Sequence, residues 1–362
     1  TGFIAVTASA EVGVTDTEIS VGSSLVLSGP TEGLGKGVRA GYETLINKVN
    51  KQGINGRKIK LVIKDDEYEP QLTGKNTKEL IETEKVFSLF SYIGTPTTNA
   101  ATSVLNGTGV TLLGMFTGAQ AFREPVNPQL YHIRASYFAE TERLVSHFVE
   151  KGKKKIGIFI QSDGYGTAGK DGVAKALTAR GLDFAGQGSY ARNTVAIENG
   201  LARLLESKPE VVICVGTYKA CAAFLKAAHA KNFSPEFATI SFVGTSNLVK
   251  EIGADGEGTI ISQVLPNPWL STTALVKEYQ ADMKASGQAD FDYTSLEGYV
   301  NAKVLIEALT IAGKDLTRAS FNKALSSINK DFGGFKIDFS KGQQGSSQVF
   351  LTKIQGGKVV DL

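Results

Sequence analysis

One glycine-rich segment has nearly the spacing of a phosphate-binding loop. Residues 164–171 read GYGTAGKD and lie between an apolar, strand-like run and a helical pattern. They satisfy G-x-G-x-x-G and approach G-x-x-x-x-G-K-[ST]. Asp171 replaces the hydroxyl that would hold magnesium, and a dinucleotide site would need an acidic residue at the end of the next strand, where Ser189 and Tyr190 stand. We therefore predict a glycine-rich ligand loop with Tyr165 at its tip, and keep a nucleotide-dependent enzyme as the less favoured alternative.

A second glycine-rich segment, residues 33–37, follows the first strand-like run. The third glycine of a dinucleotide pattern would fall at position 38, which is Val38. We interpret this segment as a flexible entry to a helix, whose first N–H groups are free to bind an anion.

The residues that could perform catalysis or bind a metal are few and scattered. His132, His147 and His229 lack the spacing of metal ligands, and the nucleophile pattern G-x-S-x-G is absent. The acidic cluster 65–67 follows a strand-like run and could form a carboxylate site, but a solvated turn or helix cap is the favoured interpretation. We expect no enzyme activity, no cofactor and no metal.

Composition predicts a globular protein of two domains. The chain has 362 residues, of which 42% are hydrophobic and 21% charged, and its net charge is +3. The densest basic run, 153–155, is interpreted as a solvated connection rather than a nucleic-acid site. Cys214 and Cys221 match no zinc or redox spacing, so buried free thiols are expected, although export could permit their oxidation.

The first residues suggest export. They read TGFIAVTASAEV, and Ala8-Ser9-Ala10 has the small-x-small pattern that signal peptidase cleaves. We assign residues 1–17 to a signal remnant or a flexible mature terminus. No later run reaches the roughly 18 apolar residues of a membrane span, so we expect a soluble, periplasmic protein.

Apolar runs alternate with amphipathic helical patterns along the chain. This alternation predicts βαβ units and parallel sheets covered on both faces. The series restarts near residue 137, which indicates a second sheet, and residues 131–136 and the proline-rich 266–269 suit crossings between the two. The predicted strands are 19–27, 58–63, 86–93, 110–113, 155–160, 184–190, 211–215, 239–243, 334–338 and 348–354. The predicted helices are 35–50, 73–83, 97–105, 137–150, 167–180, 196–206, 220–230, 273–285 and 295–312.

From about Glu18 to its end, the chain resembles the branched-chain-amino-acid type of periplasmic solute-binding protein, the receptor component of ABC importers. The resemblance rests on short motifs at the ends of predicted strands, in a specific order. These are Ser28-Gly29-Pro30, Gly53-Ile54-Asn55-Gly56-Arg57, Asp65-Asp66, Gly94-x-x-x-Thr98, Tyr165-Gly166, Gly216-Thr217-Tyr218 and Gly244-Thr245-Ser246.

The resemblance implies an α/β fold of two doubly wound, Rossmann-like lobes joined by three hinge crossings. Lobe 1 would comprise residues 18–134 plus 265–340, and lobe 2 residues 135–264 plus 341–362. It implies a monomer that captures a small ligand by hinge closure and delivers it to an ABC permease in the inner membrane, with no nucleic-acid partner. The alternative is a sensory domain of the same fold for amides or aromatic acids.

The resemblance also implies the site. A hydroxyl at Thr98 and the loop 115–118 would hold a ligand carboxylate, and Tyr165 and Tyr218 would cover the ligand. Ser246 stands where amino-acid binders carry a carboxylate for the ligand ammonium, and a serine cannot neutralise that charge. Three alternatives follow. The ligand is an acid without an amine, such as an aromatic or keto acid; it is an amide; or a carboxylate elsewhere in the protein takes the place of the missing one and pairs with the ligand ammonium. The predicted ligand-binding residues are Ser28, Leu34, Thr97, Thr98, Phe116, Thr117, Gly118, Tyr165, Tyr218 and Ser246.

Overall fold

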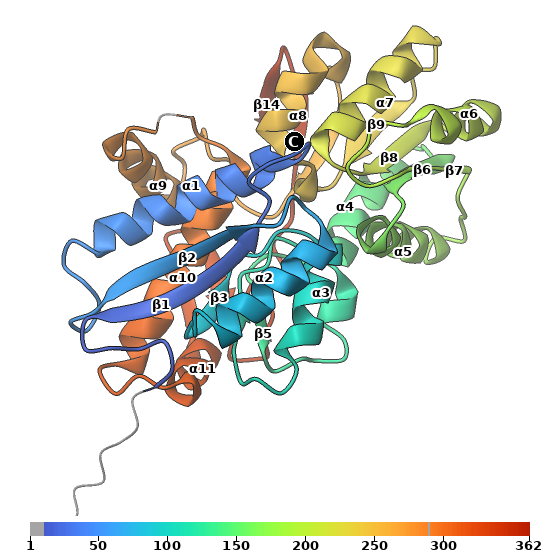
Figure 1. The fold of residues 1–362 in the computed structure, drawn as a ribbon. Helices are drawn as coiled ribbons and strands as arrows, with labels where there is room; N and C mark the ends of the chain where they lie inside the picture. The colour runs from blue at the N-terminus through green and yellow to red at the C-terminus, as the bar shows by residue number, and fades with distance from the viewer. Residues whose placement is uncertain (1–10, 289) are drawn as a thin grey trace, which may run out of the picture.

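Two separate β-sheets organise the chain, which a computed structural model describes over residues 11–288 and 290–362. The first sheet is entirely parallel and has the strand order β2-β1-β3-β4-β5 (Figure 1). We call the part of the chain built on this sheet lobe 1. Its strands are β1 (Glu18–Leu25), β2 (Lys58–Asp65), β3 (Ser88–Phe90), β4 (Leu112–Leu113) and β5 (Leu130–Tyr131).

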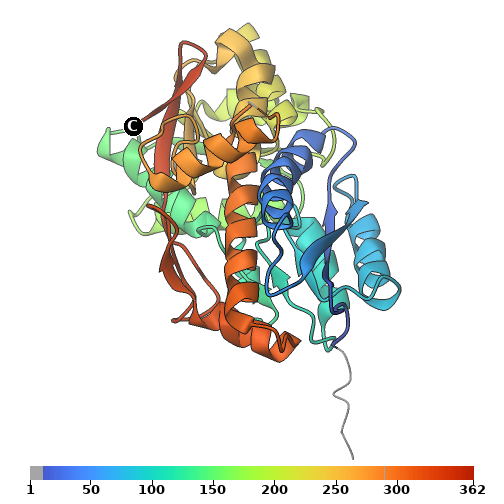
Figure 2. The same ribbon diagram turned by 90° about the vertical axis from the view of Figure 1, so that its left-hand side faces the viewer.

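Helices cover both faces of this sheet, as Figure 2 shows. On one face, α1 packs against α10 so closely that a Cβ added at Gly41 or Gly298 would overlap the backbone of the other helix. On the other face, α2 packs against α3. The helices of this lobe are α1 (Glu32–Val49), α2 (Pro70–Glu82), α3 (Thr95–Leu105), α9 (Ala274–Ala285), α10 (Tyr293–Ala312) and α11 (Arg318–Ser327).

The second sheet has the order β14-β13-β10-β9-β8-β6-β7, and we call the part built on it lobe 2. Its strands are parallel except for β13 and β14, which form an antiparallel hairpin around Gly356 and Gly357, both with positive φ. The strands are β6 (Ile156–Gln161), β7 (Gly186–Tyr190), β8 (Val211–Val215), β9 (Glu236–Thr239), β10 (Ile260–Gln263), β13 (Phe350–Gln355) and β14 (Lys358–Asp361). The helices are α4 (Tyr137–Glu150), α5 (Gly164–Thr178), α6 (Glu198–Ser207), α7 (Tyr218–Ala230) and α8 (Thr245–Ile252).

The chain passes between the two sheets three times. It leaves the first sheet after β5, returns toward it after β10, and reaches the second sheet again at β13, beyond the short hairpin of β11 (Asn329–Asp331) and β12 (Lys336–Asp338). The predicted fold class, two doubly wound α/β lobes with three crossings, is confirmed. The exact division into residue ranges stays a prediction, and the proposed cleavage pattern at 8–10 lies outside the described residues.

The structure corrects several predicted elements. The predicted strand 239–243 is wrong, because β9 ends at Thr239 and Ser241–Val243 form a 3-10 turn. The elements α8, α11, β5, β10, β11 and β14 were not predicted, since each is too short to show a sustained hydrophobic period in the sequence. Cys214 and Cys221 are buried free thiols, as predicted.

Two kinds of feature are absent from the residues that the structure describes. None of their helices is long and apolar enough to cross a bilayer. Among the same residues, no group of three or more His, Cys, Asp or Glu side chains could hold a metal ion.

Candidate ligand-binding site

The strand orders place one topological switch point in each lobe. In lobe 1 the chain moves from β1 to one side of the sheet and then crosses to the other side at β3. In lobe 2 it does the same at β6 and β8. Ligands of open α/β sheets bind beyond the carboxyl ends of strands at such points. The segments that follow these four strands contain most of the predicted site residues, and they meet between the lobes.

An interlobe aromatic cluster joins the two sets of strand ends. The Phe242 ring of lobe 2 lies 5.5 Å from the Phe116 ring and 6.1 Å from the Tyr68 ring, both of lobe 1, measured between centroids. It also lies 4.4 Å from Tyr165, which in turn lies 5.7 Å from Tyr137. All five side chains are buried. The cluster gives the lobes a shared apolar contact that opening must break.

A pocket of about 510 Å³ opens between the lobes at the first turns of α3 and α5. Helix N-termini carry free N–H groups and positive potential that favour an anionic group. The Asp163 carboxylate already caps α5, whereas α3 has no side-chain cap among the described residues, so α3 is the helix end that can favour an anion here. The pocket lining includes Thr95, Pro96 and Asn99 from α3 and Gly164, Thr167 and Asp171 from α5.

Thr98 lies in the first turn of α3, fully buried, and its Oγ1 has no hydrogen-bond partner among the described residues. The neighbouring Thr97 hydroxyl is satisfied, because it donates to the carbonyl oxygens of Ile93 and Gly94. An unpartnered buried hydroxyl is costly. Of these two predicted residues, only Thr98 therefore retains a hydrogen bond to offer.

The loop after β4 supports this helix turn. Thr117 Oγ1 lies 2.7 Å from Thr95 Oγ1, which joins the loop to the start of α3. Gly118 is needed for close packing, because an added Cβ would lie 2.6 Å from both the ring and the backbone nitrogen of Tyr137. Phe116, Thr117 and Gly118 thus lie beside the α3 N-terminus, where the sequence placed them.

A buried charge network lies behind Phe116. The Arg134 guanidinium is 4.5 Å from the Phe116 ring centroid, and its Nε is 3.3 Å from Glu297 of α10. It also donates to Ser241, whose N–H and hydroxyl in turn donate to Glu140. Burial opposes the charge of Arg134, but Glu297 and Glu140 outweigh burial and raise its pKa. For both carboxyls burial dominates, so the pKa of Glu140 is raised and that of Glu297 reaches about 7.

The segment Gly164–Lys170 is the start of α5, so the prediction of a loop with Tyr165 at its tip is wrong. Asp163 caps this helix by accepting from the N–H groups of Tyr165 and Gly166 at 2.9 and 3.4 Å. A phosphate would need these same groups, and the carboxylate already occupies them. The side chain of Tyr165 packs inside the aromatic cluster, against Tyr137 and Phe242, and is not at the tip of a loop.

Tyr218 and Leu34 meet at another contact between the lobes. The Gly33 N–H donates to the Tyr218 hydroxyl at 3.3 Å, and Leu34 packs against Gly244. Both side chains are buried. They form a wall of the interlobe contact, which is compatible with the predicted cover over a ligand.

The hydroxyls of Ser28 and Ser246 bind carboxylates that are not part of the aromatic cluster. Ser28 Oγ donates to Asp65 at 2.6 Å. Ser246 Oγ donates at 2.7 Å to Asp292, the residue that caps α10, and Ser246 and Asp292 line a groove of about 530 Å³ that also contains Lys36. Each hydroxyl therefore donates to a protein carboxylate in this structure, and the role of both residues as ligand contacts stays a prediction.

Sequence reasoning missed three rings of the cluster and all four residues of its charge network: Tyr68, Tyr137 and Phe242, and Arg134, Glu140, Ser241 and Glu297. Tyr68 follows β2 by three positions, so the strand-end rule could have identified it. Arg134 lies in the first predicted crossing, where a lone charge in an apolar run was a usable signal. Phe242 was hidden by the incorrect strand prediction for 239–243.

Known proteins share this architecture. A leucine/isoleucine/valine-binding protein from Rhodopirellula baltica SH 1, described as possible, is 32% identical with a TM-score of 0.91, covering 98% of each chain. "Leu/Ile/Val-binding protein homolog 7" of Brucella suis biovar 1 is 26% identical over 95% of this chain and 90% of its own. A solute-binding protein from R. palustris in complex with benzoate shares the fold, with 19% identity, a TM-score of 0.85 and coverage of 95% of each chain.

The match to a family model extends over almost the whole chain. The family is described as "Periplasmic binding protein", and its model matches residues 18–358. Its members are solute-binding proteins rather than enzymes. This chain belongs to the periplasmic binding protein family and to the type that includes the Leu/Ile/Val-binding proteins.

Proposed function

We propose that this protein is a monomeric periplasmic receptor that closes its two lobes around a small carboxylate and delivers it to the permease of an ABC importer. The observation that carries the proposal is the buried, unpartnered hydroxyl of Thr98 at the N-terminal turn of α3. A ligand carboxylate would accept from this hydroxyl and lie in the positive potential of the helix N-terminus.

The aromatic cluster supports a ligand with an apolar body. Its rings come from both lobes and fill the space between them, so ligand entry requires the lobes to part and the rings to pack again around the guest. Burying an apolar ligand body against such rings is favourable. Closure would then be stabilised by contacts from both sides at once, which is the basis of hinge capture.

The carboxylates around the cluster favour a ligand without an ammonium group. Glu140 accepts from the N–H and hydroxyl of Ser241 and from Ser262, and Glu297 lies against Arg134. A ligand ammonium would need a free carboxylate beside it, because a buried unpaired charge is costly. The carboxylate on the pocket lining, Asp171, is exposed to solvent rather than buried with the cluster. We therefore favour an aromatic or keto acid, and the benzoate named for the R. palustris protein makes benzoate a rational first probe.

Thermal-shift measurements with matched pairs test this function. The pairs are benzoate with benzamide, pyruvate with pyruvamide, and leucine with leucinamide, together with ATP and NAD. A ligand that binds only the folded state raises the melting temperature. We expect at least one carboxylate to raise it and its amide to do so less. Stabilisation by ATP or NAD, or by amides in preference to acids, would contradict the proposal.

The importer role needs its own test. Disrupting the gene in its native cell should abolish high-affinity uptake of the same acid that stabilises the purified protein, and restoring the gene should recover uptake. Unchanged uptake together with an altered transcriptional response to the acid would instead indicate the sensory alternative.

A further inference from the structure

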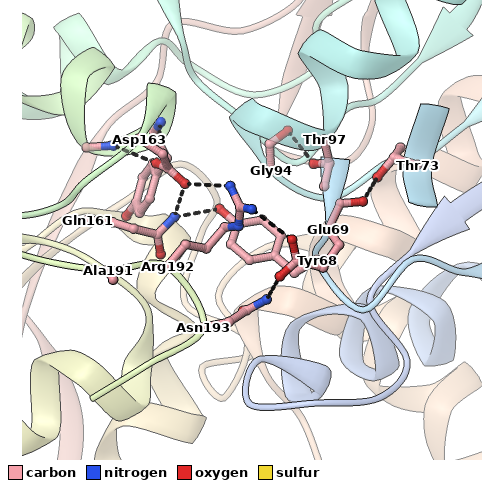
Figure 3. A network of polar contacts seen from close by, with 12 residues as sticks. Tyr68, Glu69, Thr73, Gly94, Thr97, Gln161, Asp163, Ala191, Arg192 and Asn193 are labelled. Atoms are coloured by element: carbon pink, nitrogen blue, oxygen red, sulfur yellow. Dashed lines mark hydrogen bonds and ion pairs between the residues drawn. The ribbon is translucent and has the colours of Figure 1, made fainter. Parts of the chain in front are cut away.

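A ring of polar contacts crosses between the lobes at the edge of the aromatic cluster (Figure 3). Arg192 Nη2 of lobe 2 lies 2.8 Å from Glu69 Oε2 of lobe 1, and its Nη1 lies 3.5 Å from Asp163 Oδ2. Gln161 Nε2 donates to the same Asp163 oxygen at 2.7 Å and to the Tyr68 hydroxyl at 3.3 Å. Because Tyr68 and Glu69 are neighbours, the contacts form a closed circuit that joins the lobes twice. We call these five residues the closure ring.

Asn193 of lobe 2 also binds Glu69. Its Nδ2 donates to Glu69 Oε1 at 2.7 Å and to the Glu67 carbonyl oxygen at 3.2 Å. Both carboxylate oxygens of Glu69 therefore bind donors from the loop after β7. Arg192 also keeps a carboxylate partner within its own lobe, Asp163, so it remains positioned when the lobes part.

The backbone on both sides of the ring has positive φ values. Glu67, Tyr68 and Asn193 have φ values of 52°, 60° and 58°, in the left-handed region, which asparagine tolerates but which is costly for Glu67 and Tyr68. Such conformations persist where surrounding contacts enforce them, and they concentrate at functional sites. Here the buried carboxylate of Asp66 enforces one of them by accepting from the Tyr68 N–H at 3.0 Å.

The ring is coupled to both walls of the candidate site. The Tyr68 ring packs directly on Gly94, the residue that precedes α3, so that a Cβ at Gly94 would overlap it. On the other side, Asp163 caps α5 at the N–H of Tyr165. Movement of either wall would therefore disturb the ring contacts.

We propose that the closure ring is a latch that holds the lobes together and slows ligand release. This role rests on the proposed function, in which closure captures the ligand. The Arg192 and Glu69 side chains are 24% and 41% exposed, so solvent and salt weaken their attraction and leave the latch reversible. Glu69 and Arg192 lie outside the aromatic cluster and act on the ligand only through closure, so they are positioning residues, whereas Tyr68 belongs to both the ring and the cluster.

Interlobe distances measured by pulsed electron–electron double resonance test the latch in the ligand-free protein. Spin labels at K78C on α2 and E206C on α6 report on lobes 1 and 2; both positions are exposed, whereas Cys214 and Cys221 are buried. We expect Glu69→Gln to shift the population toward longer distances. Glu67→Gln is the matched control, because the Glu67 side chain makes no hydrogen bond or ion pair among the described residues.

A double-variant comparison makes the test specific. If Glu69 and Arg192 act through one contact, Arg192→Gln should shift the distances in the same direction, and the double variant should shift them little further. Raising the salt concentration from 50 mM to 1 M should reproduce part of the shift in the wild type only. A Glu69→Gln distribution identical to the wild type would overturn the latch. A failed carboxylate screen with shifted distances would instead reject the proposed ligand class and leave the latch standing.

Discussion

Arg134 and Glu297 form a buried ion pair, with Arg134 Nε 3.3 Å from Glu297 Oε1. Arg134 lies in the first crossing between the lobes and Glu297 lies on α10 of lobe 1. Through Ser241 the same arginine contacts lobe 2. The pair therefore links the first crossing to lobe 1, and Arg134 extends this link to lobe 2.

This pair predicts a pH dependence of folding stability. Burial raises the pKa of Glu297 from 4.5 in the unfolded chain to about 7, despite the attraction of Arg134. Between these values the unfolded chain has lost a proton that the folded protein retains, so the free energy of unfolding falls as pH rises from 4.5 to 7. In Glu297→Gln this contribution is absent. Between pH 5 and pH 8 the stability of the variant relative to wild type should rise by about 2–3 kcal/mol.

Urea unfolding at the two pH values checks this prediction. The comparison between variant and wild type removes the contributions of other buried carboxyls, such as Asp66, whose pKa burial also raises. A stability difference that stays constant with pH would show that Glu297 is ionised throughout the range.

Thr98→Ala separates binding from folding. Because Thr98 Oγ1 has no partner among the described residues, its loss should leave the stability of the ligand-free protein nearly unchanged. Calorimetric titration with the acid found in the screen should show binding weakened by about 1–3 kcal/mol. Thr102→Ala, one turn later with an exposed hydroxyl, is the control. Equal affinity in the two variants would remove Thr98 from the site.

Ser246→Ala tests the prediction that Ser246 contacts the ligand. Its hydroxyl donates to Asp292, so it already has a partner between the lobes. We expect its loss to change affinity by about 1 kcal/mol or less, the usual net worth of one hydrogen bond. A loss as large as that of Thr98→Ala would place Ser246 among the ligand contacts.

Gly94→Ala tests the packing of Tyr68 on the α3 entry. Gly94 has φ +97°, and an added Cβ would overlap the Tyr68 ring and lie 3.0 Å from Thr97 Oγ1. Overpacking and backbone strain together should destabilise the protein by about 2–4 kcal/mol in urea unfolding. Gly107→Ala is the control, since Gly107 has φ +79° but open space around its Cβ position. Similar losses in both variants would mean that backbone strain alone accounts for the effect.

The sequence predicted the alternation of strands and helices because buried parallel strands are apolar throughout and amphipathic helices have a clear period. It therefore placed Thr98 and Tyr165 correctly in the segments that follow β3 and β6, although Tyr165 lies in the first turn of α5 and not at the tip of a loop. It failed where a short segment is determined by tertiary contacts, as at β14, whose partner β13 completes the second sheet. The pairing of Ser246 with Asp292 could not be predicted either, because it joins lobes that only the folded chain brings together.

A crystal structure of the protein with its stabilising acid bound tests the central claim most directly. We expect the ligand carboxylate within hydrogen-bond distance of Thr98 Oγ1, and the ligand body against Tyr165 and Phe242. A ligand held instead in the groove of Ser246 and Asp292, with nothing beside Thr98, would contradict the account.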